Sequence, residues 1–579
     1  MKRRTVVTYL IFVIPWFIVS YILVLIVPAF VNSHDWRTRI ELLESSFDQL
    51  YPLTFYPATY IAIGVFTIGY ILAVYGIRFS KKDYRLGREY GDAMWGNINQ
   101  INRAIGLKRP KLLRFLSRFS VLNKGDKFTR RLRERILLSK HLSINLDTWS
   151  HGRNCNVVVV GGSGSGKTRG YVKPNLLQGN TSYVVLDPAG EILRDNGHSL
   201  ESMGYKIRVI DLVDMEKSDK YNPFAYIRTD NDVMMLITTL IKNTTPAGST
   251  TTDPFWEKAE TMLVSALMLL LHHFGLPSEK NFRMLMTLLT EAKGDTSREN
   301  ILDTLFACYD SVHPGNIASL TYHRVKSGAE KTMQSIIITA SARLTKFDLE
   351  SLQNLTMDDE MAFETYGDEK TALFIKTPVV DSSFNFMAGM VYTQLFQQLY
   401  SVADKEPMGH LKIPVHFLMD EFANVKLPED FEKILSTSRK HWILISIILQ
   451  NVAQLKAIYE KSWESIIGNC DTFIYLGGNE QSTHDYISKA LGKETIRTKT
   501  YQMTRGGHGS SSVNFNQLGL ELMSPDQVRR LDNRKCIVMV RGERPVIDDK
   551  YKLKKHPNIK TSADGGGHFY IHNMKEERP

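Results

Sequence analysis

The chain contains a full phosphate-binding pattern, GxxxxGK(S/T), in the stretch Gly161-Gly162-Ser163-Gly164-Ser165-Gly166-Lys167-Thr168. It follows the apolar run 155–160, which predicts a buried strand, and opens the segment 167–178, which predicts a helix. Glycines let backbone N–H groups approach phosphate oxygens, and the helix directs its positive end at the same anion. We expect Lys167 to reach the β- and γ-phosphates and Thr168 to give its hydroxyl to Mg²⁺, so the pattern predicts an ATP site. A chance glycine-rich turn would not need the flanking strand and helix.

A phosphate loop alone does not separate a motor from a kinase, so its acidic partner matters. The run 415–421 reads as a buried strand that ends in two carboxylates, Asp420 and Glu421. We expect Asp420 to hold Mg²⁺ through water and Glu421 to polarise the attacking water as general base. Such a pair is typical of motor-type ATPases, whereas the plainer alternative is a solvated acidic turn.

A second strand, 442–449, ends in Gln450. Because the carboxyl ends of parallel strands line one crevice, we expect Gln450 near the γ-phosphate, where it would sense hydrolysis. Arg439 lies between the two strands on a predicted helix, 431–440. It is a candidate arginine finger for a neighbouring subunit. Taken by itself, it reads more simply as a surface cation.

A long insertion separates the halves of this site, because Lys167 and Asp420 lie 253 positions apart. Asp187 and Glu191 follow a core strand and are expected either at the crevice mouth or as turn and cap residues. From 230 to 353 the apolar spacing is helical. We therefore predict an α/β nucleotide-binding domain over 151–229 and 354–550, an all-α domain over 230–353, and a flexible tail over 551–579.

Two apolar stretches near the start, 6–30 and 58–77, predict transmembrane helices. At about 1.5 Å per residue each is long enough for a hydrocarbon core of roughly 30 Å. A cleaved signal peptide fits less well, because the first run is long and no clear cleavage site follows it. Basic residues flank the outer ends of both stretches. The positive-inside rule then places both termini in the cytoplasm and the loop 31–55 outside, with 1–80 as a membrane anchor.

Positive charge is concentrated beside this anchor. The chain has a formal net charge of +11, while residues 78–140 alone hold 18 Lys/Arg and 5 Asp/Glu, a local net of +13. The predicted linker 81–150 therefore suits contact with anionic lipid, nucleic acid or both. The four cysteines are far apart, so neither a zinc site nor a disulfide framework is predicted, and a reducing compartment fits.

Taken together, these features resemble the TraG/TraD-type coupling proteins of type IV secretion. The resemblance covers nearly the whole chain and rests on the two apolar spans, the phosphate loop, the α insertion, the run 418–422 and the order of Arg439 and Gln450. It extends to the segments 90–95, 187–191, 221–224 and 253–256. Ala189 stands where the family usually has a lysine, which puts only that lysine's role in doubt.

The resemblance implies a RecA-like core, a homo-hexameric ring and DNA-stimulated ATP hydrolysis with Mg²⁺. It also implies recruitment of a DNA strand with an attached relaxase, expected to be single-stranded, to a conjugation channel in the plasma membrane, with the motor domain in the cytoplasm. The roles given above to Lys167, Thr168, Asp420, Glu421, Arg439 and Gln450 match the family's at each position. Two alternatives stay open: an FtsK-like DNA pump, which usually adds a long linker and a winged helix, and an ATP-binding docking receptor that hydrolyses little.

Overall fold

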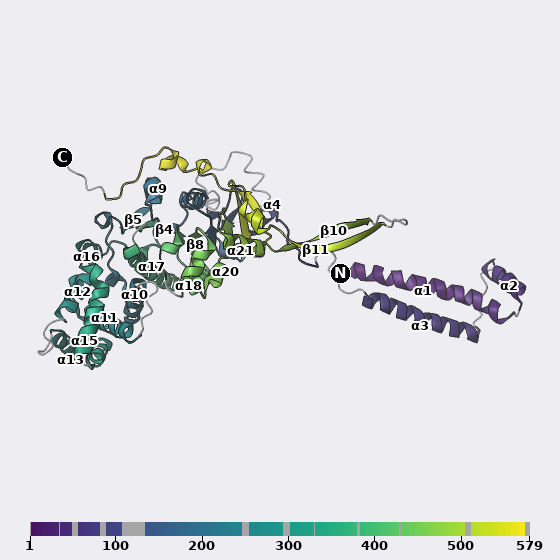
Figure 1. Ribbon diagram of the computed structural model, residues 1–579, viewed down its shortest axis with the longest axis horizontal. Coiled ribbons are helices and arrows are strands. Elements are labelled where there is room, and N and C mark those ends of the chain that lie inside the picture. Colours follow the sequence, from purple (N-terminus) through teal and green to yellow (C-terminus); the bar gives the residue numbers. More distant parts are fainter. Residues whose placement is uncertain are drawn as a thin grey trace. The chain divides into compact units, whose positions relative to one another are not determined.

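The computed structural model describes residues 2–33, 35–48, 56–80, 89–106, 134–245, 254–292, 301–328, 330–378, 382–425, 427, 430–503 and 511–573. It divides into two compact units, Met1–Gly91 with Thr495–Gly519, and Asp92–Glu494 with Leu520–Pro579 (Figure 1). Most of the basic stretch expected beside the membrane, 81–88 and 107–133, lies outside the described residues.

The first unit contains a helical hairpin of α1 (Lys2–Val31) and α3 (Pro57–Ser80), with α2 (Trp36–Asp48) between them. Trp16 of α1 donates from Nε1 to Thr67 Oγ1 of α3 at 3.2 Å. Windows of 19 residues in α1 and α3 have mean hydropathies of 2.4 and 1.8, enough by length and composition to cross a membrane. Their outward side chains are large and apolar, among them Phe17, Ile18, Ile61, Val65 and Leu72. Such surfaces are consistent with membrane anchoring.

The same unit includes a two-stranded hairpin of β10 (Lys493–Met503) and β11 (Ser511–Glu521). Thr495 Oγ1 accepts from the backbone N–H groups of Tyr90 and Gly91 at 3.1 and 3.2 Å, and donates to Gly91 O at 2.9 Å. The base of the hairpin thus holds the segment that follows the anchor. The sequence analysis did not predict this hairpin.

The second unit is built on a nine-stranded sheet of order β13-β12-β9-β3-β8-β7-β4-β6-β5. The strands are β3 (Val157–Val160), β4 (Ser182–Leu186), β5 (Lys206–Asp211), β6 (Thr371–Lys376), β7 (Val415–Met419), β8 (Ile443–Leu449), β9 (Thr472–Tyr475), β12 (Lys535–Val540) and β13 (Val546–Asp549). The seven strands from β9 to β5 run parallel, while β12 and β13 are antiparallel additions at one edge. The central strands are buried along their whole length, as expected for a parallel sheet covered on both faces.

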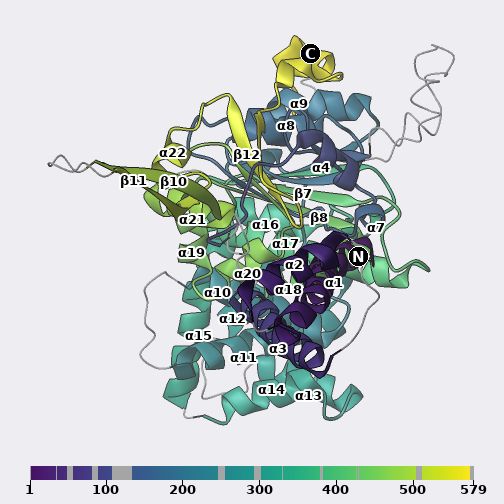
Figure 2. The ribbon, with the colours of Figure 1, turned by 90° about the vertical axis from the view of Figure 1, so that its right-hand side faces the viewer.

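Alternate side chains of β3 enter two different cores. Val158 and Val160 belong to the larger one, with α17 (Asn385–Lys405) and α18 (Phe431–His441). Val157 and Val159 belong to the smaller one, with α8 (Lys173–Leu176), α9 (Glu191–Ser202) and α4 (Ile98–Ile105). Figure 2 shows α8 and α9 over one face of the sheet and α17 and α18 over the other. The result is a three-layer α/β unit.

The described part of the inserted stretch, between 230 and 357, consists of helices joined by turns. Its helices are α10 (Asp230–Thr244), α11 (Pro254–Phe274), α12 (Phe282–Glu291), α13 (Ile301–Val312), α14 (Ile317–Lys326), α15 (Glu330–Leu344) and α16 (Glu350–Met357). α11 packs against α10, α14 and α15, and α10 also packs against α17 of the α/β layers. Stacked rings of Phe282 and Phe347, 4.0 Å between centroids, join α12 to the turn after α15.

The stretch 551–573 is not the flexible tail expected from its polar composition. Tyr570 N–H donates to Arg194 O at 2.8 Å, and Asn558 Nδ2 donates to Leu177 O at 2.8 Å. His572 pairs with Asp219 at 3.0 Å. The partners are more than 350 positions away, so this order comes from tertiary contacts that local composition does not reveal. Residues 574–579, the rest of the expected tail, lie outside the described part.

Candidate functional site

The phosphate loop leaves the end of β3 and is bonded to both neighbouring strands. Gly161 N–H donates to Leu449 O, at the end of β8, at 3.0 Å. Gly162 N–H donates to Gly477 O, just after β9, at 2.8 Å. The loop therefore lies at the carboxyl edge of the parallel strands, where ligands of open α/β sheets bind.

Two kinds of constraint require glycine in this loop. Gly164 and Gly166 have φ of 72° and 88°, in the left-handed region that other residues rarely adopt. At Gly161, a Cβ would lie 2.4 Å from Ser165 Oγ. Glycine thus permits both the loop's curvature and its close packing on itself.

Lys167 is buried, and its ammonium lies against the loop. Nζ donates to Gly161 O at 2.8 Å and to Gly162 O at 3.2 Å. Burial lowers the pKa of Lys167, while the nearby carboxylates of Asp420 and Glu421 oppose the shift. The positive charge is therefore held beside the backbone that would surround a phosphate.

Thr168 and Asp420 meet across the sheet. Thr168 Oγ1 donates to Asp420 Oδ2 at 2.7 Å, and Asp420 is only 7% exposed. Its other oxygen, Oδ1, is buried and has no hydrogen-bond partner in the part of the chain that the structure describes. Burial raises the pKa of Asp420, and the bond from Thr168 opposes that shift. A free carboxylate oxygen beside a threonine hydroxyl fits the oxygen ligands that Mg²⁺ prefers.

Glu421 and Asp187 complete an acidic edge. Glu421 has φ of 54°, rare for a residue other than glycine, and its Oε2 accepts from Asn424 Nδ2 at 3.0 Å. Asp187 follows β4, which pairs with β7, and is 2% exposed. Burial raises the pKa of Asp187 to about 6, and the charge of Asp420 adds to the shift. A strained glutamate and a carboxyl that resists ionisation are typical of functional sites.

The two remaining candidates, Gln450 and Arg439, lie at opposite edges of the sheet. Gln450 follows Leu449, to which the loop is bonded, so it lies beside the loop, and its N–H donates to Gln454 Oε1 at 3.0 Å. Arg439 lies at the end of α18, just before β8 begins. Its Nη2 donates to Thr148 O at 3.0 Å, in the helical turn that precedes β3. Arg439 is therefore at the amino edge of the sheet, opposite the loop of its own chain.

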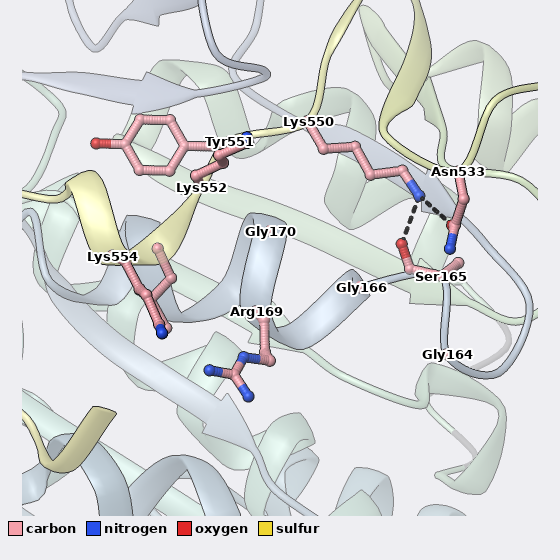
Figure 3. A pocket seen from close by; sticks show the side chains of 11 residues that line it. Gly164, Ser165, Gly166, Arg169, Gly170, Asn533, Lys550, Tyr551, Lys552 and Lys554 are labelled. Carbon is pink, nitrogen blue, oxygen red and sulfur yellow. Dashed lines mark hydrogen bonds between the residues drawn. The ribbon is translucent and has the colours of Figure 1, made fainter. Parts of the chain in front are cut away.

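A basic cavity of about 390 Å³, which no sequence pattern predicted, lies beside the loop. Lys550 reaches it from the end of β13, and its Nζ donates to Ser165 O at 2.7 Å and to Asn533 Oδ1 at 3.2 Å (Figure 3). Three further cations line the cavity with Tyr551: Arg169, Lys552 and Lys554. Burial lowers the pKa of Lys550. No motif marks these residues, because nearly 400 positions separate most of them from the phosphate loop.

The predicted helix 167–178 is present as two consecutive helical pieces. A π-helical turn, η1 (Thr168–Val172), comes first, and the short helix α8 follows. Lys173 N–H donates to Thr168 O, five residues back, in place of the usual four. The pattern GxxxxGK(S/T) carries no signal for this difference.

Comparison with known proteins gives a consistent result. Residues 124–563 match the family model described as type IV secretory system conjugative DNA transfer. The VirD4 protein of Rhizobium radiobacter is 23% identical over 422 residues, which is 70% of this chain and 57% of the relative. The conjugal transfer protein TraG of Rhizobium radiobacter is 23% identical over 412 residues, 69% of this chain and 61% of the relative. The chain thus spans less than two thirds of the length of these curated relatives.

Solved structures share the fold. The bacterial conjugative coupling protein TrwBdeltaN70 in its unbound form aligns with a TM-score of 0.51 and 18% identity, over 70% of this chain and 86% of that one. The plasmid coupling protein TrwB in complex with ADP and Mg²⁺ aligns with a TM-score of 0.51 and 16% identity, over 75% and 93%. These likenesses confirm the predicted fold, an α/β RecA-like core with inserted helices.

Proposed function

This chain belongs to the type IV secretory system conjugative DNA transfer family, and we propose that it is a membrane-anchored coupling protein, a DNA-dependent ATPase that delivers relaxase-bound DNA to a conjugation channel. The observation that carries the proposal is the bond of 2.7 Å from Thr168 Oγ1, in the phosphate loop, to Asp420 Oδ2, after β7. It joins the phosphate-binding and metal-binding halves of an ATPase site across 252 positions of sequence. VirD4, TraG and TrwB support the same reading.

Each residue of the site has a role that its surroundings suit. Lys167 moves its ammonium from the carbonyls of Gly161 and Gly162 to phosphate oxygens, while Ser163, Gly164 and Gly166 present backbone N–H groups. Thr168 would hold Mg²⁺ directly and Asp420 through water, and the ion would neutralise charge on the transferred phosphoryl group. Glu421 orients and deprotonates the attacking water, and Gln450, beside the loop, reports the state of the γ-phosphate.

The basic cavity fits the remainder of the nucleotide. It adjoins Gly164 to Gly166 of the phosphate loop. It also adjoins Arg169 and Gly170, where the chain leads away from the phosphates. Its volume of about 390 Å³ lies within the usual range for small-molecule sites. We assign the ribose and base to it, with Lys550 closing the loop side and Tyr551 offering an aromatic ring.

Arg439 acts on a neighbouring copy. In its own chain it lies at the sheet edge opposite the phosphate loop, so only another subunit's nucleotide is within reach. Its guanidinium is bonded to Thr148 O and Gly152 O and lies over the Trp149 ring, 5.4 Å from the centroid. This arrangement favours a ring of copies, a homo-hexamer by family resemblance, in which each subunit completes the next.

The anchor and the basic linker place this motor at a membrane. The helical hairpin of α1 and α3 spans the plasma membrane, with both termini and the motor in the cytoplasm. The excess of Lys/Arg over 78–140 meets lipid headgroups, the DNA strand or both. The partners are DNA, the relaxase that it carries and the proteins of the channel.

ATP hydrolysis by the full-length protein in detergent, with and without single-stranded DNA, tests the proposal. We expect DNA to stimulate hydrolysis, and Glu421→Gln to abolish it while ATP-analogue binding is retained. Binding that persists without hydrolysis in the unchanged protein, under every condition, would contradict the motor and favour a docking receptor.

A further inference from the structure

The turn that follows Thr168 is held in a rare geometry. It is π-helical over Thr168–Val172, closed by the bond from Lys173 N–H to Thr168 O. Such turns are uncommon, appear mostly as single insertions in helices, and are frequent at functional sites. Because the turn carries one more residue than an α-turn, it changes the direction in which Thr168 projects relative to α8.

One carboxylate joins the two ends of this turn. Asp564 Oδ1 accepts from Arg169 Nη2 at 2.9 Å, and Asp564 Oδ2 accepts from Lys173 Nζ at 2.9 Å. The side chain of Asp564 is 11% exposed, and that of Lys173 is 1% exposed. Each oxygen thus holds a different cation, one near the beginning of the turn and one just after its end.

Asp564 with Arg169 and Lys173, called the clamp below, belongs to a wider network of ion pairs. Lys173 Nζ also donates to Glu191 Oε1 at 2.8 Å and to Asp195 Oδ2 at 2.6 Å, so its ammonium meets three carboxylates. Arg194 Nε donates to Asp195 Oδ1 at 2.9 Å, which makes three cations against three carboxylates. Burial opposes the charge of Lys173, but the carboxylates prevail and raise its pKa. Without Asp564, Lys173 keeps two acceptors, whereas Arg169 loses its bond to a carboxylate.

Asp564 is itself fixed by a tight chain segment. It lies in the turn Ala563–Gly565, where a Cβ on Gly565 would come 2.0 Å from Ile559 O. Thr561 Oγ1 lies 2.5 Å from Ser199 Oγ of α9 and attaches the same segment to the sheet's helical layer. The segment therefore presents Asp564 to the π turn from a position set by its own packing.

We propose that Asp564 is a positioning residue for ATP hydrolysis, because its clamp on Arg169 and Lys173 holds the π turn and so sets where Lys167 and Thr168 project toward Asp420. The inference rests on the proposed function and deepens it. If the turn relaxes to α-helical geometry, Thr168 Oγ1 no longer meets Asp420 and the Mg²⁺ site opens. Catalysis is sensitive to this, since a displacement of about 1 Å can lower a rate about 100-fold.

The test compares Asp564→Ala, Asp564→Asn and Asp564→Glu with Thr561→Ala in the full-length protein. Thr561→Ala removes one attachment of the same segment, the contact with Ser199, but leaves the carboxylate of Asp564 and both of its cations in place. We expect Asp564→Ala to lower kcat about 10-fold to 100-fold and to raise the Mg²⁺ concentration needed for half-maximal activity, with a smaller change in KM for ATP. Asp564→Glu should restore part of kcat, and Thr561→Ala should keep it near the unchanged protein's value.

Binding of a fluorescent ATP analogue, titrated with Mg²⁺, separates this inference from the proposed function. If the unchanged protein binds but does not hydrolyse ATP, the motor fails, yet Asp564→Ala should still weaken the Mg²⁺-dependent part of binding. Unaltered Mg²⁺ dependence in folded Asp564→Ala, or an equal loss in Thr561→Ala, would overturn the clamp. If Asp564→Ala does not fold, the nearly isosteric Asp564→Asn replaces it in the same Mg²⁺ titration, with the same expected result.

Discussion

At the scale of single residues, acidic side chains are gathered where the parallel strands end. Asp187 follows β4, and Asp420 and Glu421 follow the neighbouring β7. Burial raises the pKa of both aspartates, so their ionised forms are disfavoured in the absence of a cation. Buried carboxylates of this kind lower the stability of the empty protein and raise its affinity for a positive ligand.

Asp187→Asn should therefore stabilise the nucleotide-free protein at neutral pH. The folded-state pKa of about 6 lies above the ordinary 3.8, so ionisation opposes folding above pH 6, and this penalty disappears as the pH falls toward 4. The difference corresponds to at most about 3 kcal/mol. Asparagine can still accept the bond that Leu193 N–H donates to Asp187 Oδ2 at 2.8 Å.

Thermal unfolding of both proteins between pH 4 and 8, without nucleotide or Mg²⁺, checks this expectation. The variant's Tm should exceed that of the unchanged protein at pH 7.5, and the gap should close near pH 4. A gap that is constant with pH would show that the carboxyl of Asp187 ionises as it does in the unfolded chain.

At the carboxyl edge of the sheet, the sequence predicts the residues that belong to a short motif or that end a buried strand. The phosphate loop is predictable because GxxxxGK(S/T) reflects local backbone geometry, and Asp420 because a buried strand ends at it. Lys550 and Asp564 carry no such signal. They reach Ser165 and Lys173 only through folding, 385 and 391 positions away.

At the scale of elements, the apolar runs predict the strands well, whereas the helices and polar segments packed around them are predicted less well. β3, β7 and β8 are four to seven residues of continuous buried side chains, a pattern that few other structures share. The helix expected over 167–178 opens with the π turn, and Asp564 contacts Arg169 within it and Lys173 just after it. The segment 551–573 was missed, since polar composition does not reveal distant partners.

Arg439, at the end of α18, leads to a testable prediction. Arg439→Ala should lower ATP hydrolysis about 1,000-fold or more while leaving ATP-analogue binding unchanged, as for a finger supplied in trans. Arg541→Ala is the matched control, because Arg541 Nη2 also donates to Gly152 O, at 3.2 Å, as Arg439 Nη1 does at 3.3 Å. Steady-state hydrolysis and unfolding temperatures of both variants provide the measurement.

Mixing distinguishes a finger in trans from a local role. Arg439→Ala and Glu421→Gln subunits, each inactive alone, should regain part of the activity when assembled together, because some sites then pair an intact Glu421 with an intact Arg439. Normal hydrolysis by Arg439→Ala would remove Arg439 from the site, and failure of the mixture to recover activity would argue against action between subunits.

At the scale of the whole molecule, an apolar helical hairpin and a nucleotide-binding unit belong to one chain. The family match over residues 124–563 covers most of the nucleotide-binding unit and leaves the apolar helical hairpin outside it. Hydropathy and length predict the two apolar helices, since both are properties of local sequence. Assembly into a ring and the choice of cargo depend on surfaces between molecules, so neither could be derived from residue patterns and both entered through resemblance.

The central claim is that ATP turnover at this site drives DNA transfer. The most direct measurement is the frequency of DNA transfer between cells in which Lys167→Ala replaces the unchanged protein, with membrane insertion followed in the same cells. Lys167 is chosen because its ammonium lies 2.8 Å from the carbonyl oxygen of Gly161, within the phosphate loop. The account predicts that transfer is abolished while the protein still enters the membrane. Transfer at an undiminished frequency would contradict it.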